Sequence, residues 1–561
     1  MSRAPHDTLG GDARGQRAVR RILASLTQDT QAWVAVLLIA GAIGLFVAFP
    51  LGRVVLTPQL EEWSRLLARD RWVTALRNTM LITLLSTLSA TVLGFIYAYA
   101  IERVRITGSR VLTVLAILPL LSPPFLGAIA IIMLLGRQGL ITNQLLGVDF
   151  QLYGLNGLWI VQTLGFFPIA FLTIRGVLRA VSVNLEHAAR DLGASRWYIF
   201  RTIVFPLSLP GVVSAALLVA IFVLGDFASP MILGGRFRVL ATEAYTQVVG
   251  WADLRMGAAL ATVLFVPTAI FFVLQRLILR RGSYVTVTGR AGSEIGPVPQ
   301  HWLVRAFLQL ICWSLAGVIL SIYAMIVYGS FTTLWGVDFS LSFDNFRLAS
   351  AYTRDIVNSI SFAAYAGVAT AFLAVFAAYI IHRKAFPGRN ILDISVLLPA
   401  AIPGTLLGIA YILAFNTPPF LLTGTAFIVV ASMVFRSLPV GYRSAVSGFS
   451  QIDPSLEESA TDLGAGLFKR FFTIMLPLLA PAFTAALVFT FVDSINTLSA
   501  VIFLVTPRTS LATVRVLNLV EYGEWGQAAA LTLLLLLFVF LTLAAFALIF
   551  GRRGGIKLFD L

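Results

Sequence analysis

The sequence predicts an all-α polytopic membrane protein with about 12 transmembrane helices, arranged as two parallel six-helix repeats. Of the 561 residues, 58% are hydrophobic and only 12% are charged, whereas soluble domains carry about 25% charged residues. Apolar runs of the length that a bilayer requires recur along the whole chain. The two halves also share sequence at fixed offsets, which indicates an internal repeat.

The apolar runs locate the expected spans, since one span needs about 20 mostly apolar residues. In the first half the runs lie near residues 33–52, 77–101, 111–136, 156–178, 209–233 and 256–279. In the second half they lie near residues 303–330, 357–381, 391–415, 424–445, 479–505 and 527–550. Pro168 and Pro439 interrupt the fourth run of each half. Runs this long predict helices, because the strands of a membrane barrel alternate over about 10 residues.

The distribution of basic residues predicts the orientation. With the N-terminus inside, 28 of the 41 lysine and arginine residues fall in the inner segments, which favours cytoplasmic N- and C-termini. Both halves then enter and leave the membrane in the same direction, so they are parallel repeats. The expected domains are a cytoplasmic N-terminal tail (1–32), a first repeat (33–280), a cytoplasmic linker (281–302), a second repeat (303–551) and a cytoplasmic C-terminal tail (552–561).

Two segments repeat most clearly, and the numbers of their matching positions differ by 271 throughout, as in Leu185 and Leu456. Residues 185–210 read LEHAARDLGASRWYIFRTIVFPLSLP, and residues 456–481 read LEESATDLGAGLFKRFFTIMLPLLAP. Further back the offset is 280, and it pairs Asn78 with Asn358, Tyr99 with Tyr379, Gly108 with Gly388, Pro119 with Pro399 and Pro123 with Pro403.

Each repeated segment predicts a short cytoplasmic helix, a turn at glycine and a second helix that enters the membrane. Gly193 and Gly464 stand at the turn, where glycine permits a positive φ or the close approach of a partner. Apolar and small residues alternate with Glu, Asp and Arg in both segments. The pattern therefore predicts an exposed helix that offers small residues and an acidic rim to a partner.

These segments resemble the EAA loop of binding-protein-dependent ABC importer permeases, whose pattern is Glu-Ala-Ala, three residues, Gly, and a later Leu-Pro. The resemblance covers nearly the whole chain. It departs from the pattern at His187, Glu458 and Ser459, which occupy positions where alanine is usual. We therefore refer to residues 185–210 and 456–481 as the first and second coupling segments.

The resemblance implies a type I ABC importer permease fold that works by alternating access. In this family the loop forms a coupling helix, which sits in a cleft of the ATPase subunit and transmits its closure to the spans. The residues that the resemblance assigns to ATPase coupling are Glu186, Ala189, Asp191, Gly193, Glu457, Ala460, Asp462 and Gly464.

The sequence also limits the chemistry of the chain itself. It contains no Gly-Lys-Ser/Thr, so it lacks the phosphate-binding loop of P-loop ATPases, and no catalytic residues stand out. We expect no enzyme activity and no cofactor in this chain. The resemblance implies that ATP and Mg²⁺ bind to separate ATPase subunits, in two copies, and that a periplasmic solute-binding protein delivers the substrate to the bacterial inner membrane.

Nucleic-acid and disulfide chemistry are not expected. The net charge is +15, but the arginines form short clusters between apolar runs, which is typical of positive-inside topology rather than of a nucleic-acid groove. The single cysteine, Cys312, cannot form a disulfide or a thiolate metal cluster within one chain.

Candidates for the substrate path come from polar residues in the fifth spans, namely Asp226, Asp493 and Asn496. Acids inside a membrane are costly and mark functional sites by default. An equally weighted alternative is that each acid caps a helix break or bonds to a neighbouring span. No metal-binding set is defined by the sequence.

The substrate is inferred from resemblance alone. The stretches GDFASPMILGGRFRVLATEAYTQVVG, SYVTVTGR and SAVIFLVTPRTSLATVRVL resemble fused permeases of the ferric-iron, aminoethylphosphonate and thiamine group. Of these substrates, the resemblance favours ferric iron, and oxygen-bearing side chains would suit this hard cation. Aminoethylphosphonate, thiamine and polyamines are alternatives, and a secondary transporter of the major facilitator type is an alternative of a different class.

Overall fold

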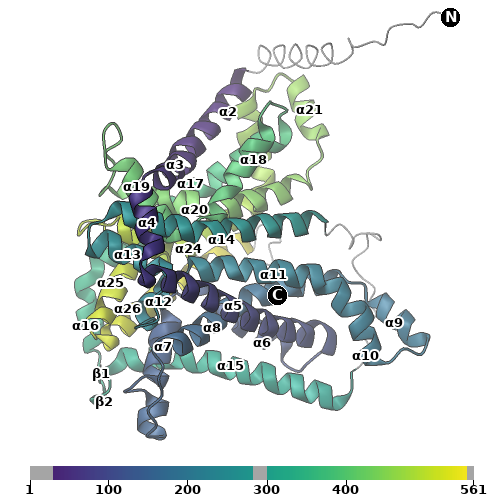
Figure 1. Ribbon diagram of the computed structural model, residues 1–561. Helices are drawn as coiled ribbons and strands as arrows, with labels where there is room; N and C mark the ends of the chain where they lie inside the picture. The colour runs from purple at the N-terminus through teal and green to yellow at the C-terminus, as the bar shows by residue number, and fades with distance from the viewer. Residues whose placement is uncertain (1–29, 282–299, 552–561) are drawn as a thin grey trace, which may run out of the picture. The chain divides into compact units, whose positions relative to one another are not determined.

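The computed structural model describes residues 30–281 and 300–551. Most of the expected N-terminal tail, the linker and the C-terminal tail therefore lie outside the described residues. The chain forms two compact units, whose elements are labelled in Figure 1. Of the described residues, unit 1 comprises 30–49, 364–400 and 433–491, and unit 2 comprises 50–281, 300–363, 401–432 and 492–551. The second coupling segment lies in unit 1 and the first lies in unit 2.

The prediction of an α-helical membrane protein is confirmed. In the described part of the chain, ten helices are long and apolar enough to cross a membrane, and the number rises to twelve if each of two sharply bent pairs forms one span. The uninterrupted α-helices among them are α5 (Asp70–Tyr99), α8 (Leu155–Ala180), α11 (Phe205–Gly225), α14 (Leu254–Arg281), α15 (Trp302–Phe331), α17 (Thr353–Arg383), α20 (Ala426–Phe449) and α26 (Trp525–Gly551).

The first span is helical from α2 (Thr30–Ile43) to the end of α3 (Phe49–Leu56), with the π-helical turn η1 (Gly44–Ala48) between them. The β1 (Thr332–Leu334) and β2 (Asp338–Leu341) strands form a short antiparallel hairpin after α15.

The third spans differ from the prediction of continuous helices. In the first half, α6 (Ser109–Leu121) ends before Pro123, and α7 (Leu126–Leu135) starts after it. In the second half, the helical run that begins at Arg389 ends at Ala401, and α19 (Gly404–Phe415) starts directly after Pro403. Proline lacks an N–H group and disfavours helical geometry in the preceding residue, so the two prolines that the repeat pairs break both spans.

Pro168 and Pro439 do not break the fourth spans, which are single helices at the predicted positions. Each proline lies inside one helix, α8 or α20. Neighbouring helices and local adjustments satisfy the freed backbone groups of prolines in membrane helices. A proline in these spans is therefore a weaker stop signal than the prolines of the third spans.

The helices of the fifth spans end earlier than predicted. Helix α11 ends at Gly225, and the short α12 (Ala228–Leu233) follows after two residues. In the second half, the helical run Leu467–Leu478 is followed by α24 (Ala480–Ile495), and the chain bends by 78° between them. Helix α24 ends at Ile495, before the next short helical turn.

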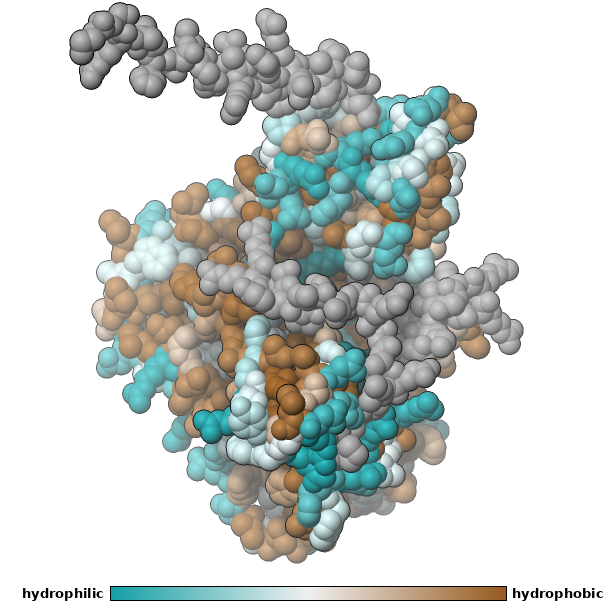
Figure 2. Space-filling model, turned by 90° about the vertical axis from the view of Figure 1, so that its right-hand side faces the viewer, coloured by the Kyte–Doolittle hydropathy of each residue, from teal (hydrophilic) through white to brown (hydrophobic). Residues whose placement is uncertain are grey.

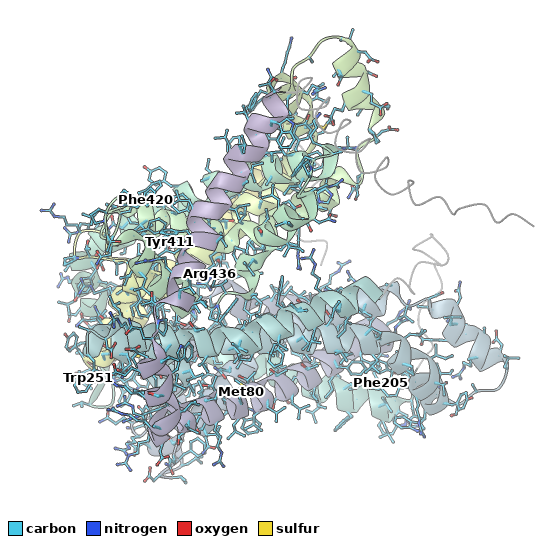
Figure 3. The ribbon with its side chains drawn as sticks, turned by 45° about the horizontal axis from the view of Figure 1, so that its top comes forward. Met80, Phe205, Trp251, Tyr411, Phe420 and Arg436 are labelled. Carbon is cyan, nitrogen blue, oxygen red and sulfur yellow. The ribbon has the colours of Figure 1, made fainter. Side chains whose placement is uncertain are left out.

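The long helices of unit 2 run between its two ends. Figure 3 labels Trp251 at one end, Met80 partway along α5, and Phe205 within the first coupling segment. The helical run Asp70–Val104 has 35 residues, so at 1.5 Å per residue it is roughly 50 Å long. A bilayer with its headgroups is about 40–45 Å thick. We call the end of unit 2 opposite the coupling segment the distal end.

At the distal end, both halves make the same polar contacts between the second span and a helix that follows the fifth span. In the first half, Asn78 donates to the Arg238 carbonyl at 3.0 Å, and the Leu240 amide donates to Thr79 Oγ1 at 2.9 Å. In the second half, the corresponding bonds are Asn358 to the Arg508 carbonyl (3.1 Å) and the Ala512 amide to Ser359 Oγ (2.9 Å). The helices that follow the fifth spans are α13 (Leu240–Tyr245) and α25 (Ala512–Glu521).

An ion pair accompanies each set of contacts, but its charges are exchanged between the halves. Arg71 on α5 pairs with Glu243 on α13 at 2.7 Å. In the second half the acid is on the span instead: Asp355 of α17 pairs with Arg515 of α25 at 2.9 Å. Glu243 and Asp355 are both buried, so each requires its cation.

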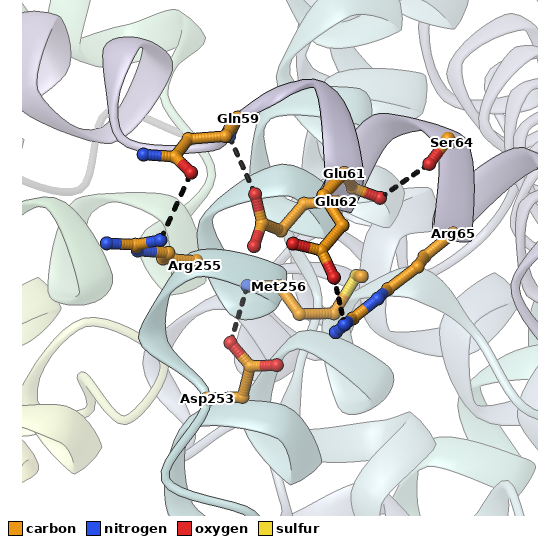
Figure 4. A network of polar contacts seen from close by, with 8 residues as sticks. All are labelled: Gln59, Glu61, Glu62, Ser64, Arg65, Asp253, Arg255 and Met256. Carbon is orange, nitrogen blue, oxygen red and sulfur yellow. Dashed lines mark hydrogen bonds and ion pairs between the residues drawn. The ribbon is translucent and has the colours of Figure 1, made fainter.

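A short amphipathic helix, α4 (Leu60–Ala68), is held at the distal end by its own polar network (Figure 4). The Gln59 amide donates to Glu62 Oε2 at 2.7 Å, and Arg255 donates to Gln59 Oε1 at 3.3 Å. This pattern satisfies an otherwise free amide at the start of the helix. Glu62 is buried by these contacts, so it is not available as a surface charge.

Candidate functional site

The first coupling segment has the predicted order of helix, glycine turn and helix. Helix α9 (Val183–Asp191) ends in a Schellman motif, in which the Gly193 amide donates to the Arg190 carbonyl at 2.9 Å and the Ala194 amide donates to the Ala189 carbonyl at 3.0 Å. Gly193 has φ +87°. This left-handed conformation costs an L-residue about 1–2 kcal/mol and costs glycine little. The Ser195 side chain then caps α10 (Arg196–Ile199).

The second coupling segment repeats this backbone at the matching positions. Helix α21 (Ser455–Asp462) ends where the Gly464 amide donates to the Thr461 carbonyl at 2.8 Å and the Ala465 amide donates to the Ala460 carbonyl at 3.0 Å. Gly464 has φ +79°, and α22 (Leu467–Arg470) follows. The predicted turn at glycine is therefore confirmed in both units.

The turns present apolar and acidic side chains to the outside. Leu192 and Leu463, at matching positions just before the glycines, are 89% and 87% exposed. The neighbouring Asp191 and Asp462 are also exposed. On the face shown in Figure 2, hydrophobic patches interrupt the hydrophilic surface. An exposed leucine beside an acid, repeated at matching positions, suits a partner that offers an apolar cleft with a basic edge.

The expected acidic rim is wrong for Glu186 and Glu457, which face inward. Glu186 pairs with Arg103 at 2.8 Å, and the two side chains are only 4% and 3% exposed. Burial raises the pKa of Glu186, and the Arg103 guanidinium opposes that rise. A carboxylate this buried needs a cation, so Glu186 attaches the segment to the end of the second span through Arg103.

An arginine at the end of each second span holds the adjacent coupling segment. Arg103 Nη2 donates to the carbonyls of Leu178 (2.6 Å) and Val181 (2.8 Å), where α8 ends and α9 begins. Arg383 Nη2 donates to the carbonyl of Ile452 at 2.7 Å and approaches that of Phe449 at 3.5 Å. The accepting residues match at the offset of 271. We call each set an arginine clamp.

The arginine clamps were missed by the sequence analysis although a signal was present. Arg103 and Arg383 are related by the same offset of 280 as Tyr99 and Tyr379. Charge clusters at span ends are common in membrane proteins, so their repetition was the only clue to a specific contact.

The two halves differ in how they neutralise the repeated glutamate. Glu457 accepts a hydrogen bond from Tyr379 at 2.7 Å and pairs with Lys384 at 3.3 Å, whereas Glu186 pairs with its clamp arginine. Ala460 is buried, and Ala189 packs against the apolar core of its unit. Their small side chains allow each coupling helix to lie close to the spans.

Asp226 lies at the end of α11 rather than within a span, and it has two partners. Its Oδ2 accepts from Gln162 Nε2 of α8 at 2.9 Å, and its Oδ1 accepts from the Ser229 amide at 3.3 Å, at the start of α12. Gln162 in turn accepts from Ser86 of α5 at 3.1 Å. The contacts correspond to the alternative in which the acid caps a helix break and bonds to a neighbouring span. Gln162 was not singled out from the sequence, since a lone glutamine in a span has no distinctive pattern.

Asp493 and Asn496 lie at the end of α24, away from the position of Asp226 in the repeat. At the offset of 271, Asp226 corresponds to Thr497 and Asp493 to Phe222. Asp493 is half-buried in the last turn. Asn496 Nδ2 donates to the Leu121 carbonyl at 3.2 Å, where α6 ends, and its buried Oδ1 has no hydrogen-bond partner among the described residues. Within the described ranges, no group of three or more His, Cys, Asp or Glu is arranged to hold a metal ion.

Replacement of Asp226 by alanine is expected to lower stability by about 1–3 kcal/mol, because Gln162 Nε2 and the Ser229 amide would lose their acceptor in a buried region. Asp226→Asn keeps one acceptor oxygen and should lose less. Thermal unfolding in detergent gives the measurement. If transport fell sharply in both variants while the unfolding temperature stayed unchanged, Asp226 would belong to the substrate path instead.

Comparison with known proteins gives a consistent family assignment. Residues 90–283 and 370–554 each match the profile of the binding-protein-dependent transport system inner membrane component. The chain is 35% identical over 484 residues to the ferric transport system permease protein FbpB of Actinobacillus pleuropneumoniae, covering 84% of this chain and 70% of that protein.

Two further relatives show the range of similarity. The putative ferric transport system permease protein FbpB 1 of Haemophilus influenzae is 35% identical over 463 residues, covering 80% of this chain and 73% of the relative. The molybdenum transport system permease protein ModB of Escherichia coli is 32% identical over 162 residues, which cover 28% of this chain and 70% of the relative.

Proposed function

Because this chain belongs to the family of binding-protein-dependent transport system inner membrane components, we propose that it is the translocating subunit of an ATP-driven importer of ferric iron. The observation that carries this proposal is the repeated coupling segment, with the same Schellman turn and the same exposed leucine in both halves. A surface that recurs in register in two diverged halves suits two copies of one partner.

The partner we propose is an ATPase dimer, with one subunit under each coupling segment. ATP and Mg²⁺ would bind to those subunits, and this chain would supply the path without hydrolysing ATP. Leu192 and Leu463 would enter the apolar clefts of the two subunits, and the buried Glu186 and Glu457 would keep the segments rigidly attached to the spans. Closure of the dimer would then move the two halves and alternate access to the path.

The same proposal assigns the sides of the membrane. The coupling segments and both termini would lie in the cytoplasm, in agreement with the distribution of basic residues. The distal end, about one membrane thickness away, would then receive a periplasmic solute-binding protein. The two permease repeats would occupy residues 33–280 and 303–551, joined by a cytoplasmic linker.

Ferric iron is supported by the names of two relatives that are 35% identical over at least 80% of this chain. The similarity to molybdenum permeases covers a smaller share of the chain and is retained as a comparison for the assay. The oxygen atoms of Asn496 and Asp493 would suit a hard cation, which we treat as cargo.

Reconstituted transport tests the proposal. The chain is tagged, extracted in mild detergent and analysed for co-purifying ATPase and binding protein, and the complex is placed in liposomes. Uptake of radiolabelled ferric citrate should require ATP, the binding protein and the ATPase, and excess molybdate should not compete. Uptake driven by an ion gradient without ATP would support the secondary transporter, and ATP-dependent uptake of molybdate alone would overturn the substrate assignment.

A further inference from the structure

The two coupling segments differ in how their second helix is capped. In the first, Ser195 Oγ accepts from the Tyr198 amide at 3.2 Å and so caps α10 from within the segment. The corresponding residue at the offset of 271 is Gly466, which has no side chain. The helical run Leu467–Leu478 that follows therefore lacks an internal cap at this position.

A residue from the N-terminal helix supplies an acceptor to a different amide at the start of this helical run. Gln31, in the first turn of α2, lies with its Oε1 at 2.8 Å from the amide of Leu467, which donates to it. A Cβ at residue 466 would lie only 2.9 Å from the same Oε1. The glycine at this position thus makes room for the glutamine as well as creating the need for it.

Helix α2 is itself attached to other parts of unit 1. It packs against α18 (Arg389–Leu397) and α22, and Trp33 makes an edge-to-face contact with Phe386 at 6.5 Å between ring centroids. Helix α2 therefore contacts the second coupling segment through Gln31 and the turn after the second span of the other half through Trp33.

We infer that Gln31 is a positioning residue of the second coupling segment. Helix α2 is then a structural part of that coupling site, in addition to α21 and α22. The first coupling segment has its own cap and needs no such helix. Movement of the second segment must accordingly move α2 with it or break this bond. The consequence for transport rests on the proposed function, whereas the local cap does not.

The backbone offers a direct test by moving the cap. Gly466 has φ −68° and ψ 165°, close to the −69° and 156° of Ser195. Serine can therefore adopt the conformation at residue 466 and cap the helix, provided that Gln31 no longer occupies the space. Gln31→Leu should remove the cap at Leu467. Gln31→Leu with Gly466→Ser should supply a different cap, because the equivalent Ser195 accepts from Tyr198, which corresponds to Lys469. Gln31→Glu should retain the cap at Leu467, because a carboxylate is a good acceptor at a helix N-terminus.

Amide hydrogen exchange of the full chain in nanodiscs gives the first measurement. In Gln31→Leu, exchange at Leu467 should become about five-fold faster, the change that corresponds to a typical N-cap, while residues 183–199 stay unchanged. In Ser195→Ala, the change should appear at Tyr198 and not in residues 455–470. Unchanged exchange at Leu467 in Gln31→Leu, equal acceleration in both segments, or no added protection at Lys469 in the double variant would overturn the inference.

Substrate-stimulated ATPase activity of the reconstituted complex gives the second measurement. Gln31→Leu should reduce stimulation, and the double variant should recover it. A purely structural contribution of α2 packing would not be rescued by serine at residue 466. If exchange responds as expected and stimulation does not, the cap stands and the transmission of movement through it is refuted. If the wild-type complex shows no stimulation, the proposed function fails and the exchange result still decides the cap.

Discussion

Replacing Arg103 with methionine is expected to lower the free energy of unfolding by roughly 3–5 kcal/mol, since breaking a buried ion pair leaves a charge without compensation. Arg103 is the cation beside the buried Glu186 and also donates to the carbonyls of Leu178 and Val181. The methionine side chain fills similar space but makes none of these bonds. Denaturant titration in mixed micelles measures the loss.

The second half provides a matched control for this prediction. Arg383→Met should cost less, about 1.5–3 kcal/mol for hydrogen bonds from a charged donor, because Glu457 keeps Tyr379 and Lys384. Arg103→Met combined with Glu186→Leu should recover part of the loss, since no buried charge remains. Equal losses in the two single variants would show that the ion pair with Glu186 contributes little.

Substitution of Leu192 and Leu463 by aspartate is expected to abolish binding of the ATPase without unfolding the permease. Both side chains are almost fully exposed, so the free chain loses few contacts. In the complex, each leucine would otherwise gain about 1.5–3 kcal/mol from burial, and an unpaired carboxylate would add a desolvation cost. Each substitution should therefore weaken binding by about 100-fold or more.

Binding of the purified ATPase to the permease in nanodiscs checks this prediction. Leu341→Asp is the control, because Leu341 is 70% exposed on β2 at the distal end and should leave the affinity unchanged. A double variant that still binds the ATPase as tightly as the wild type would contradict the docking of these turns.

The general architecture could be predicted from the sequence because its signals are local. Ten of the expected spans are apolar over lengths that suit only a bilayer, and Gly193 and Gly464 occupy the one turn position where glycine is needed. The third spans were predicted as continuous because hydropathy does not register a helix break. Pairing by the repeat did not identify the breaking prolines either, because Pro168 and Pro439 also share a repeat position and lie inside helices.

The partners of buried polar groups could not be predicted in the same way. Glu186 was placed on the docking surface because its type and spacing suit an exposed helix. However, Arg103, which precedes it by 83 residues and two spans, pairs with it in the interior. Asp226 was a substrate candidate because acids in spans are costly, yet Gln162 and the Ser229 amide satisfy it locally. Such pairings depend on which helices pack together, and no periodicity in the sequence reports that.

The exchanged ion pairs at the distal end also bear on how a duplicated chain assembles. If α13 paired with the span that carries Asp355, two acids would meet, and if α25 paired with the span that carries Arg71, two arginines would meet. Like charges at a buried contact disfavour the wrong combination. The two halves are thus not interchangeable at this contact, and we expect the charges to disfavour exchange of these helices between similar repeats during insertion. If the two halves were expressed as separate chains, we would expect the same charges to select the same helix pairings.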